Sequence, residues 1–298
     1  MRHTSKAGRR GCLATPYRGG RDSITSGRPR FPWLYLVLAY AFAWVFWIPI
    51  SWTRQDYQSS PLLVTALLAG VFGPGLAAII LVYLRGDRAE RQDFWRRVLD
   101  PRRIRPEWYL IVIVLWPALH LVAIALNALL GGQPPGFPLV RELVAQPVGL
   151  IVVPVLYFVQ AGLEELGWRG YMLDRVQALW SPLPVSLVLG ICHALWHLPL
   201  FWVVGTNQIE YGFGPDLWLF FALVLAGSIY STWCYNDNGR SVLAVILLHF
   251  TANLSLDVFT EPGPQFRIFQ LLVVALAGLI AAVWLRASQR QQRALAAG

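Results

Sequence analysis

The sequence has few charged residues. Only 14% of its 298 residues are Asp, Glu, Lys or Arg, whereas soluble domains average about 25%. Hydrophobic residues make up 56% of the chain and aromatic residues 13%, and aromatic residues are enriched at the two interfaces of a membrane. This composition excludes an ordinary soluble domain. It predicts one polytopic membrane domain with an all-α fold.

Acidic residues are the scarcer of the two charge types. The 16 Asp and Glu stand against 25 Lys and Arg, which gives a formal net charge of +9. In a soluble protein this excess would suggest nucleic-acid binding. Here the basic residues flank apolar runs and no RNA- or DNA-binding motif accompanies them. We therefore expect the lipid bilayer, and no nucleic acid, to be the partner of this charge.

Cysteine is also scarce, and the three cysteines lack the spacing of a metal or redox motif. Cys192 and Cys234 fall inside apolar runs, so we expect packing residues and no disulfide framework. Residues 1–30 carry no apolar stretch close behind the first arginines, unlike a cleaved signal peptide. We predict a basic, disordered cytoplasmic tail there, a transmembrane domain over 31–287 and a second cytoplasmic tail over 288–298.

Between the two tails lie about eight apolar runs, each close to the roughly 20 residues that cross a bilayer as a helix. They lie near 31–53, 61–84, 107–130, 146–167, 181–203, 216–235, 239–258 and 266–286. We expect the fourth helix to continue past Arg169 to about Val176. Proline removes a backbone donor and can bend a helix, so kinks are expected at Pro74, Pro117 and Pro154.

The basic residues predict the orientation. With the N-terminus inside, the outer segments hold only Arg54, Arg141 and Arg267 of the 25 basic residues. Because basic residues collect on the cytoplasmic side, we expect a multi-pass protein of the cell (cytoplasmic) membrane with both termini cytoplasmic.

One inner segment, Arg85–Glu107, is dense in charge but also contains bulky apolar side chains. These could share one face of a short helix lying in the inner interface, with a solvated loop as the alternative. The apolar residues in question are Phe94, Trp95, Val98 and Leu99.

Two adjacent acids, Glu164 and Glu165, stand at the end of the apolar run Val148–Val159. A carboxylate inside such a run is costly and usually functional. Glu165 and Arg169 are four residues apart, so they can form an ion pair on one helix face. Glu164 points about 100° away and would be free for proton transfer. The alternative is a charged helix end without chemistry.

Two further apolar runs carry polar pairs at the same spacing. His193 and His197 share one helix face, which is half of a zinc site by spacing although the H-E-x-x-H acid is absent. His249 and Asn253 share a face on the seventh run, and Asp257 continues it. Satisfied buried histidines and polar contacts between helices are the structural alternatives.

Together the three runs supply acid, imidazole and amide, which suits general acid–base hydrolysis. Three motifs follow one another on successive runs: E-E-x-x-x-R (Glu164 to Arg169), a histidine before Leu-Pro (His197), and H-x-x-x-N (His249 to Asn253). In this order they resemble the motifs of the CAAX protease and bacteriocin-processing family, the type II CAAX prenyl proteases. The resemblance covers about 145–260. The second family motif is often F-x-x-x-H, and here His193 occupies its first position.

The resemblance implies an intramembrane endopeptidase that cleaves a peptide bond near the membrane. Glu164 and His197 would activate water, His249 and Asn253 would bind the oxyanion, and Glu165 and Arg169 would organise the site together with His193. The family has been described both as metal-independent glutamate proteases and as zinc metalloendopeptidases, so Glu164, His197 and His249 are candidate ligands if zinc binds. We favour the metal-free mechanism.

The substrate implied by the resemblance is a membrane protein or peptide, either a prenylated CAAX protein or a bacteriocin-like precursor. The alternative to an enzyme is a non-catalytic membrane protein of the same fold, with an immunity or scaffolding role.

Overall fold

The structure is a computed structural model that describes residues 30–133, 137–259 and 264–296. Every regular element in these ranges is a helix, which confirms the all-α prediction. Most of the predicted N-terminal tail lies outside the described residues. The predicted C-terminal tail begins as helix, because the last helix continues to Ala296.

Seven helical segments of the described chain are long and apolar enough to cross a membrane. They are α1 (Trp33–Thr53), α5 (Pro106–Leu129), α7 (Gly149–Gly167) continued to Gln177, α9 (Pro182–Trp196) continued to Trp202, α11 (Pro215–Asp237), α12 (Val242–Phe259) and α13 (Pro264–Ala296). The predicted second span is two helices, α2 (Pro61–Val71) and α3 (Gly73–Arg85), bent by 45°. The count is eight if this pair is one span. The break is at Phe72, two residues before Pro74, where a kink was expected.

The remaining elements are short and connect or extend the spans. They are η2 (Tyr57–Ser59), α4 (Arg88–Leu99), η3 (Pro101–Arg103), α6 (Pro138–Ala145), η4 (Trp168–Leu173), α8 (Asp174–Gln177), η5 (Leu198–Trp202) and α10 (Asn207–Tyr211). Of these, η4 is a π-helix that links α7 to α8 without a break. The fourth span therefore continues past Arg169, as predicted.

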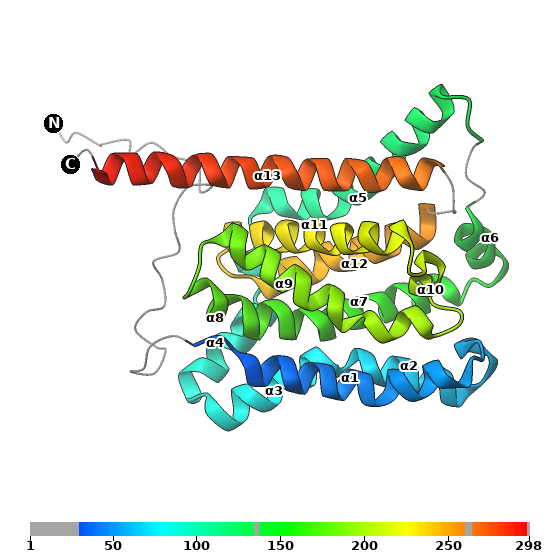
Figure 1. Ribbon diagram of the computed structural model, residues 1–298, viewed down its shortest axis with the longest axis horizontal. Coiled ribbons are helices and arrows are strands. Elements are labelled where there is room, and N and C mark those ends of the chain that lie inside the picture. Colours follow the sequence, from blue (N-terminus) through cyan, green and yellow to red (C-terminus); the bar gives the residue numbers. More distant parts are fainter. Residues whose placement is uncertain (1–29, 134–136, 260–263, 297–298) are drawn as a thin grey trace.

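The long helices run side by side, with α1, α2 and α3 along one side of the bundle and α13 and α5 along the opposite side (Figure 1). Helix α7 packs between α3 and α12, and α12 packs against α5. Helix α11 contacts α9 and α13, which completes the other half of the bundle. The helices α7, α9 and α12 thus occupy the middle of the bundle, where polar side chains can be kept away from lipid.

Glycines bring α3 close to α7. A Cβ atom on Gly75 would lie 2.7 Å from the carbonyl oxygen of Leu163, and one on Gly167 would lie 2.6 Å from that of Pro74. Both distances are far below a van der Waals contact, so only glycine fits at either position. Close backbone approach at small residues is a common way to pack helices in membranes. Here it fixes the end of α7 that carries the two glutamates.

Two alternatives were predicted for residues 85–107, a short helix or a solvated loop, and the structure contains a short helix there, α4. Phe94 and Val98 are buried against the bundle, whereas Leu99 is 67% exposed, so only part of the expected apolar face packs on the other helices. The third buried residue of α4 is instead Arg97. Its guanidinium donates to Asp93, to the Tyr235 hydroxyl and to the Gly170 carbonyl. Helix α4 is therefore anchored by polar contacts as well as by apolar packing.

These contacts also set the protonation of Arg97. Burial alone would lower the pKa of its guanidinium, but Tyr235, Asp174 and Asp93 together raise the pKa above its usual value. Arg97 is thus a permanent cation held against the π-helix η4, which contains Arg169. Helix α4, which lies outside the bundle, thus holds the backbone of η4 in place through Arg97.

Candidate functional site

Glu165 lies at the centre of a buried polar chain. Its Oε1 atom accepts a hydrogen bond from Arg169 Nη1 at 2.9 Å and another from His249 Nδ1, also at 2.9 Å. The side chains of Glu165 and Arg169 are 1% and 2% exposed. The ion pair expected from their spacing is present, and it connects α7 and η4 to α12. Arg169 compensates the carboxylate at a depth where an unpaired charge would be very costly.

Glu164 points to a different helix. Its Oε2 atom lies 2.9 Å from His193 Nε2 of α9, and its Oε1 atom accepts a longer hydrogen bond of 3.4 Å from Gln160. The residue is buried, with 1% exposure. No Arg or Lys in the described part of the chain pairs with Glu164. The two adjacent acids therefore have separate partners, as the predicted division of their roles requires.

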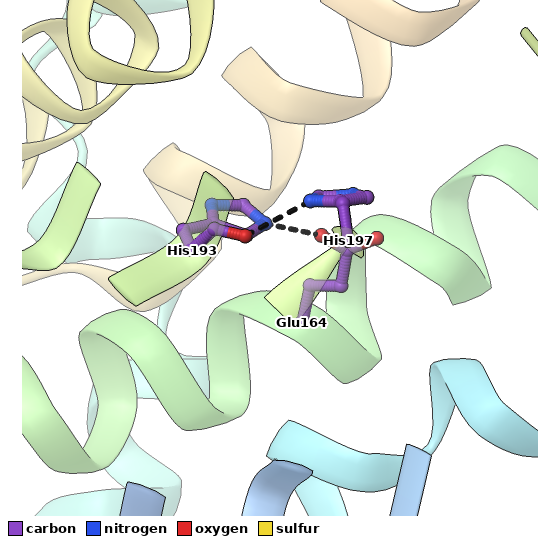
Figure 2. A group of neighbouring side chains, drawn as sticks. All are labelled: Glu164, His193 and His197. Atoms are coloured by element: carbon purple, nitrogen blue, oxygen red, sulfur yellow. Dashed lines mark hydrogen bonds and ion pairs between the residues drawn. The ribbon is translucent and has the colours of Figure 1, made fainter. Parts of the chain in front are cut away.

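His197 completes this group, as Figure 2 shows. Its Nδ1 atom donates to the backbone carbonyl of His193 at 3.0 Å. A carbonyl only accepts, so Nδ1 carries a proton, and when the ring is neutral Nε2 holds a lone pair. One ligand atom each from Glu164, His193 and His197 lie within 4.8 Å of one another. The cluster joins α7 to the C-terminal end of α9.

Large aromatic side chains surround the imidazoles. The Trp168 ring of η4 lies 5.0 Å from the His193 ring, and the Trp196 ring lies 4.7 Å from the His197 ring. Both tryptophans are fully buried. Because packed rings restrict the rotation of their neighbours, the two histidines are held in place from the sides as well as by their hydrogen bonds.

His197, His249 and Asn253 are half-buried, whereas Glu164 and Glu165 are fully buried. The His193 and His249 rings lie 6.3 Å apart, so α9 and α12 face each other across the site. Asn253 makes no side-chain hydrogen bond within the described part of the chain, so its amide is available to a ligand.

The metal-ligand candidates can be compared with this geometry. The sequence suggested Glu164, His197 and His249, whereas His193 is the residue that completes a compact group with Glu164 and His197. A carboxylate and two imidazoles are a donor set that zinc accepts. His249 instead donates to Glu165.

Two polar residues of the third span, His120 and Asn127, lie outside the site. His120 stacks on Phe269 and Phe259, with ring centroids 3.7 and 5.4 Å away. Asn127 donates to the Gln133 carbonyl at 3.0 Å. Both are packing or hydrogen-bonding residues.

Sequence reasoning missed Gln160 and Trp168 as parts of the site. Gln160 stands four residues before Glu164 on α7, so the spacing used for the other pairs would have found it. Trp168 has no such signal. It is the first residue of the π-helix η4, and π-helical turns often occur at functional sites.

Comparisons with known proteins show what the chain is similar to. A family model described as "Type II CAAX prenyl endopeptidase Rce1-like" matches residues 146–255. The chain is also similar to the CAAX prenyl protease 2 of Methanococcus maripaludis, with 28% identity over 253 residues. That alignment covers 83% of this chain and 92% of the relative. The matched family segment contains the whole polar site and nearly coincides with the core expected at 145–260.

Proposed function

We propose that this chain, which is similar to the Rce1-like type II CAAX prenyl endopeptidases, cleaves peptide bonds by means of a water molecule activated by Glu164. The single observation that carries the proposal is the division between the two acids. Glu165 is compensated by Arg169, whereas Glu164 has no Arg or Lys partner among the described residues and faces His193 and His197. A carboxylate without a fixed cation can accept a proton and return it, which is what a general base must do.

His197 suits the role of orienting that water. Its Nδ1–H is committed to the His193 carbonyl, so Nε2 can accept a hydrogen bond from water. Glu164 would take the other proton as the water oxygen attacks the carbonyl carbon of the substrate. The same proton would then pass to the leaving amine when the C–N bond breaks. Gln160 and His193 hold the carboxylate in place for both transfers.

His249 and Asn253 would stabilise the negative oxygen of the tetrahedral intermediate. Nδ1 of His249 already donates to Glu165, so Nε2 can donate to an oxyanion only when the ring carries both protons. The Glu165 carboxylate favours that imidazolium form. Asn253, one helical turn further along α12, offers an amide N–H to the same position. In this proposal Glu165 and Arg169, which were predicted to support the site, keep His249 protonated and orient its ring.

The substrate class follows from the relative. The similar protein is a CAAX prenyl protease, and we propose that this chain acts on a prenylated, membrane-associated protein near its C-terminus. The site lies within apolar spans, so a lipid-anchored substrate would be delivered at the correct depth. We also propose that the protein resides in the cell membrane with both termini cytoplasmic, as the basic residues predict.

The test is cleavage of a farnesylated CAAX peptide by the purified protein in liposomes, followed by mass spectrometry of the released tripeptide. Glu164→Gln should reduce kcat at least about 10³-fold, because it removes the base but keeps the size of the side chain. Glu210→Gln, an exposed acid on α10, is the matched control and should retain full activity.

Two results would contradict the proposal. Undiminished cleavage by folded Glu164→Gln would remove the role of Glu164. Wild-type protein that cleaves no prenylated peptide, while the Methanococcus relative does so in the same liposomes, would favour the non-catalytic alternative.

A further inference from the structure

Helix α4 has two faces of different character. Its inner face carries Phe94, Arg97 and Val98, which are buried against the bundle. Its outward face follows from helical spacing, because side chains three or four residues apart lie on the same side of a helix. The residues of this outward face are Arg88, Arg91, Gln92, Trp95 and Leu99. Arginine therefore dominates the side of α4 that no other helix covers.

The outward face of α4 forms a groove of about 650 Å³ together with the end of α3 and the residues that follow α4. Its charged lining residues are Arg88, Arg91, Arg96, Asp100 and Arg102. Within the described part of the chain none of these four arginines forms an ion pair, whereas Arg97 on the inner face pairs with Asp93. Oδ1 of Asp100 accepts a hydrogen bond from the backbone N–H of Arg102. The groove is thus strongly positive, and its guanidinium groups are left without a carboxylate partner.

Tyr83, in the last turn of α3, holds two of the lining side chains in place. Its carbonyl oxygen accepts a hydrogen bond from Arg91 Nη2 at 2.7 Å, and the guanidinium carbon of Arg91 lies 5.2 Å from the centre of the Tyr83 ring. The Tyr83 hydroxyl accepts a hydrogen bond from the Trp95 indole at 3.1 Å. A ligand would therefore meet one wall of the groove already ordered, which lowers the entropic cost of binding.

The groove lies where the chain leaves its apolar spans. Helix α3 completes the bent second span and ends at Arg85, α5 begins the next span at Pro106, and α4 connects the two. Leu84 at the end of α3 and Leu99 on α4 are 77% and 67% exposed. Tryptophan and tyrosine, which line the groove beside them, are typical of the interface between lipid and water. The groove thus combines a positive part with an exposed apolar margin at the edge of the spans.

We propose that this groove binds the headgroup of an anionic phospholipid, with the acyl chains against the exposed leucines. Phosphate oxygens accept charge-assisted hydrogen bonds from several arginines at once. A zwitterionic lipid would bring its own ammonium group into a groove that is already positive, so an anionic lipid is favoured. The apolar margin favours a lipid over a free phosphate, since only the lipid covers Leu84 and Leu99. The proposal concerns a surface outside the polar cluster and does not depend on peptidase activity.

A bound headgroup should also stabilise the docking of α4. Arg88 and Arg91 stand three residues apart on this helix, so their like charges repel each other. A phosphate between them would relieve this repulsion. The inner face of the same helix holds η4, because Arg97 Nη2 donates to the Gly170 carbonyl at 2.9 Å. Anionic lipid should therefore raise the thermal stability of the whole protein as well as occupy the groove.

The first experiment compares two lipids on the purified full-length protein by native mass spectrometry. We expect phosphatidylglycerol to bind at least about tenfold tighter than phosphatidylcholine. The triple variant Arg88→Gln/Arg96→Gln/Arg102→Gln should lose this preference. Arg54→Gln is the control, because it removes an exposed charge at the other end of the span formed by α2 and α3, and it should keep the preference.

A second triple variant tests whether charge or shape attracts the lipid. Arg88→Lys/Arg96→Lys/Arg102→Lys keeps the three positive charges and should keep most of the preference for phosphatidylglycerol. In parallel, thermal unfolding is measured with each lipid added. Phosphatidylglycerol should raise the melting temperature of the wild type at least about 2 °C above that with phosphatidylcholine, and the glutamine variant should show no such difference.

Glycerol phosphate separates a lipid site from a phosphate site, because it offers the phosphate without acyl chains. It should compete with phosphatidylglycerol only weakly. Competition as strong as that of the lipid itself would show a phosphate site instead and would overturn the proposal.

Three further results would overturn it. They are equal binding of the two lipids by the wild type, a preference kept by the glutamine variant, and a lysine variant as weak as the glutamine variant. Because these measurements use no peptide substrate, they stand apart from the cleavage assay. Wild-type protein that prefers phosphatidylglycerol but cleaves nothing supports the lipid site and contradicts the protease.

Discussion

Glu164 and Glu165 are neighbours in sequence, yet their carboxylates bind side chains of two different helices: Glu164 bonds to His193 of α9 and Glu165 to His249 of α12. One turn of α7 therefore holds both halves of the site. Any change that rotates or shifts this turn should affect water activation and oxyanion binding together.

The buried ion pair of Glu165 and Arg169 should be costly to break from either side. Glu165→Gln leaves Arg169 as an uncompensated buried cation, and Arg169→Met leaves Glu165 as an uncompensated anion. We expect each to destabilise the protein by about 3–5 kcal/mol. The double variant should lose clearly less than the sum of the two, because both charges are then gone. Thermal unfolding in detergent, read as a double-mutant cycle, measures this coupling, and strict additivity would argue against it.

The contact between α3 and α7 should depend on Gly75. A Cβ atom there would lie 2.7 Å from the Leu163 carbonyl, directly before Glu164. Gly75→Ala should therefore cost about 1–3 kcal/mol and lower the cleavage rate. Gly162→Ala is the matched control on α7, where an added Cβ meets nothing within 4 Å. It should be neutral or stabilising by about 0.5–1 kcal/mol. Equal melting temperatures for the two variants would show that the close approach is unimportant.

Asp174 should be the most sensitive acid at the end of the bundle near α4. It accepts hydrogen bonds from Arg240 and from the Tyr235 hydroxyl, and it pairs with Arg97 at 3.4 Å. Asp174→Asn leaves two partly buried arginines short of a counter-charge, so we expect a loss of about 3–5 kcal/mol.

Asp216→Asn is the comparison for this prediction. It breaks the exposed pair with Arg267 and should leave the melting temperature almost unchanged, because water and salt screen an exposed pair. Thermal unfolding at low and high salt gives both values, and the Asp216 effect alone should fade with salt. An Asp174 variant as stable as the Asp216 variant would contradict the expected difference.

His120 should be replaceable by phenylalanine with a gain in stability. Its Nε2 atom is buried without a hydrogen-bond partner among the described residues, while the ring stacks on Phe269. His120→Phe removes the unsatisfied atom and keeps the stacking, so we expect stabilisation of about 1–3 kcal/mol. His120→Ala loses the stacking and should be destabilising. A melting temperature that falls in both variants would mean that Nε2 has a partner that matters.

Much of the site could be foreseen from the chain because helical spacing is a local property. The four-residue intervals Glu165–Arg169, His193–His197 and His249–Asn253 place each pair on one face of a helix whatever the rest of the fold does. The scarcity of charge and the lengths of the apolar runs likewise determined an all-α membrane protein, because only satisfied backbones cross a bilayer.

Only tertiary packing decided which helix faces contact each other. Nothing local indicates that Glu164 contacts His193 rather than His249, because that depends on how α7, α9 and α12 pack across the bundle. The π-helical turn that brings Trp168 to His193 is also set by packing, since η4 is buried on all sides. Spacing along a helix fixes the direction of a side chain, but its partner depends on contacts between residues far apart in sequence, and those form only when the helices assemble.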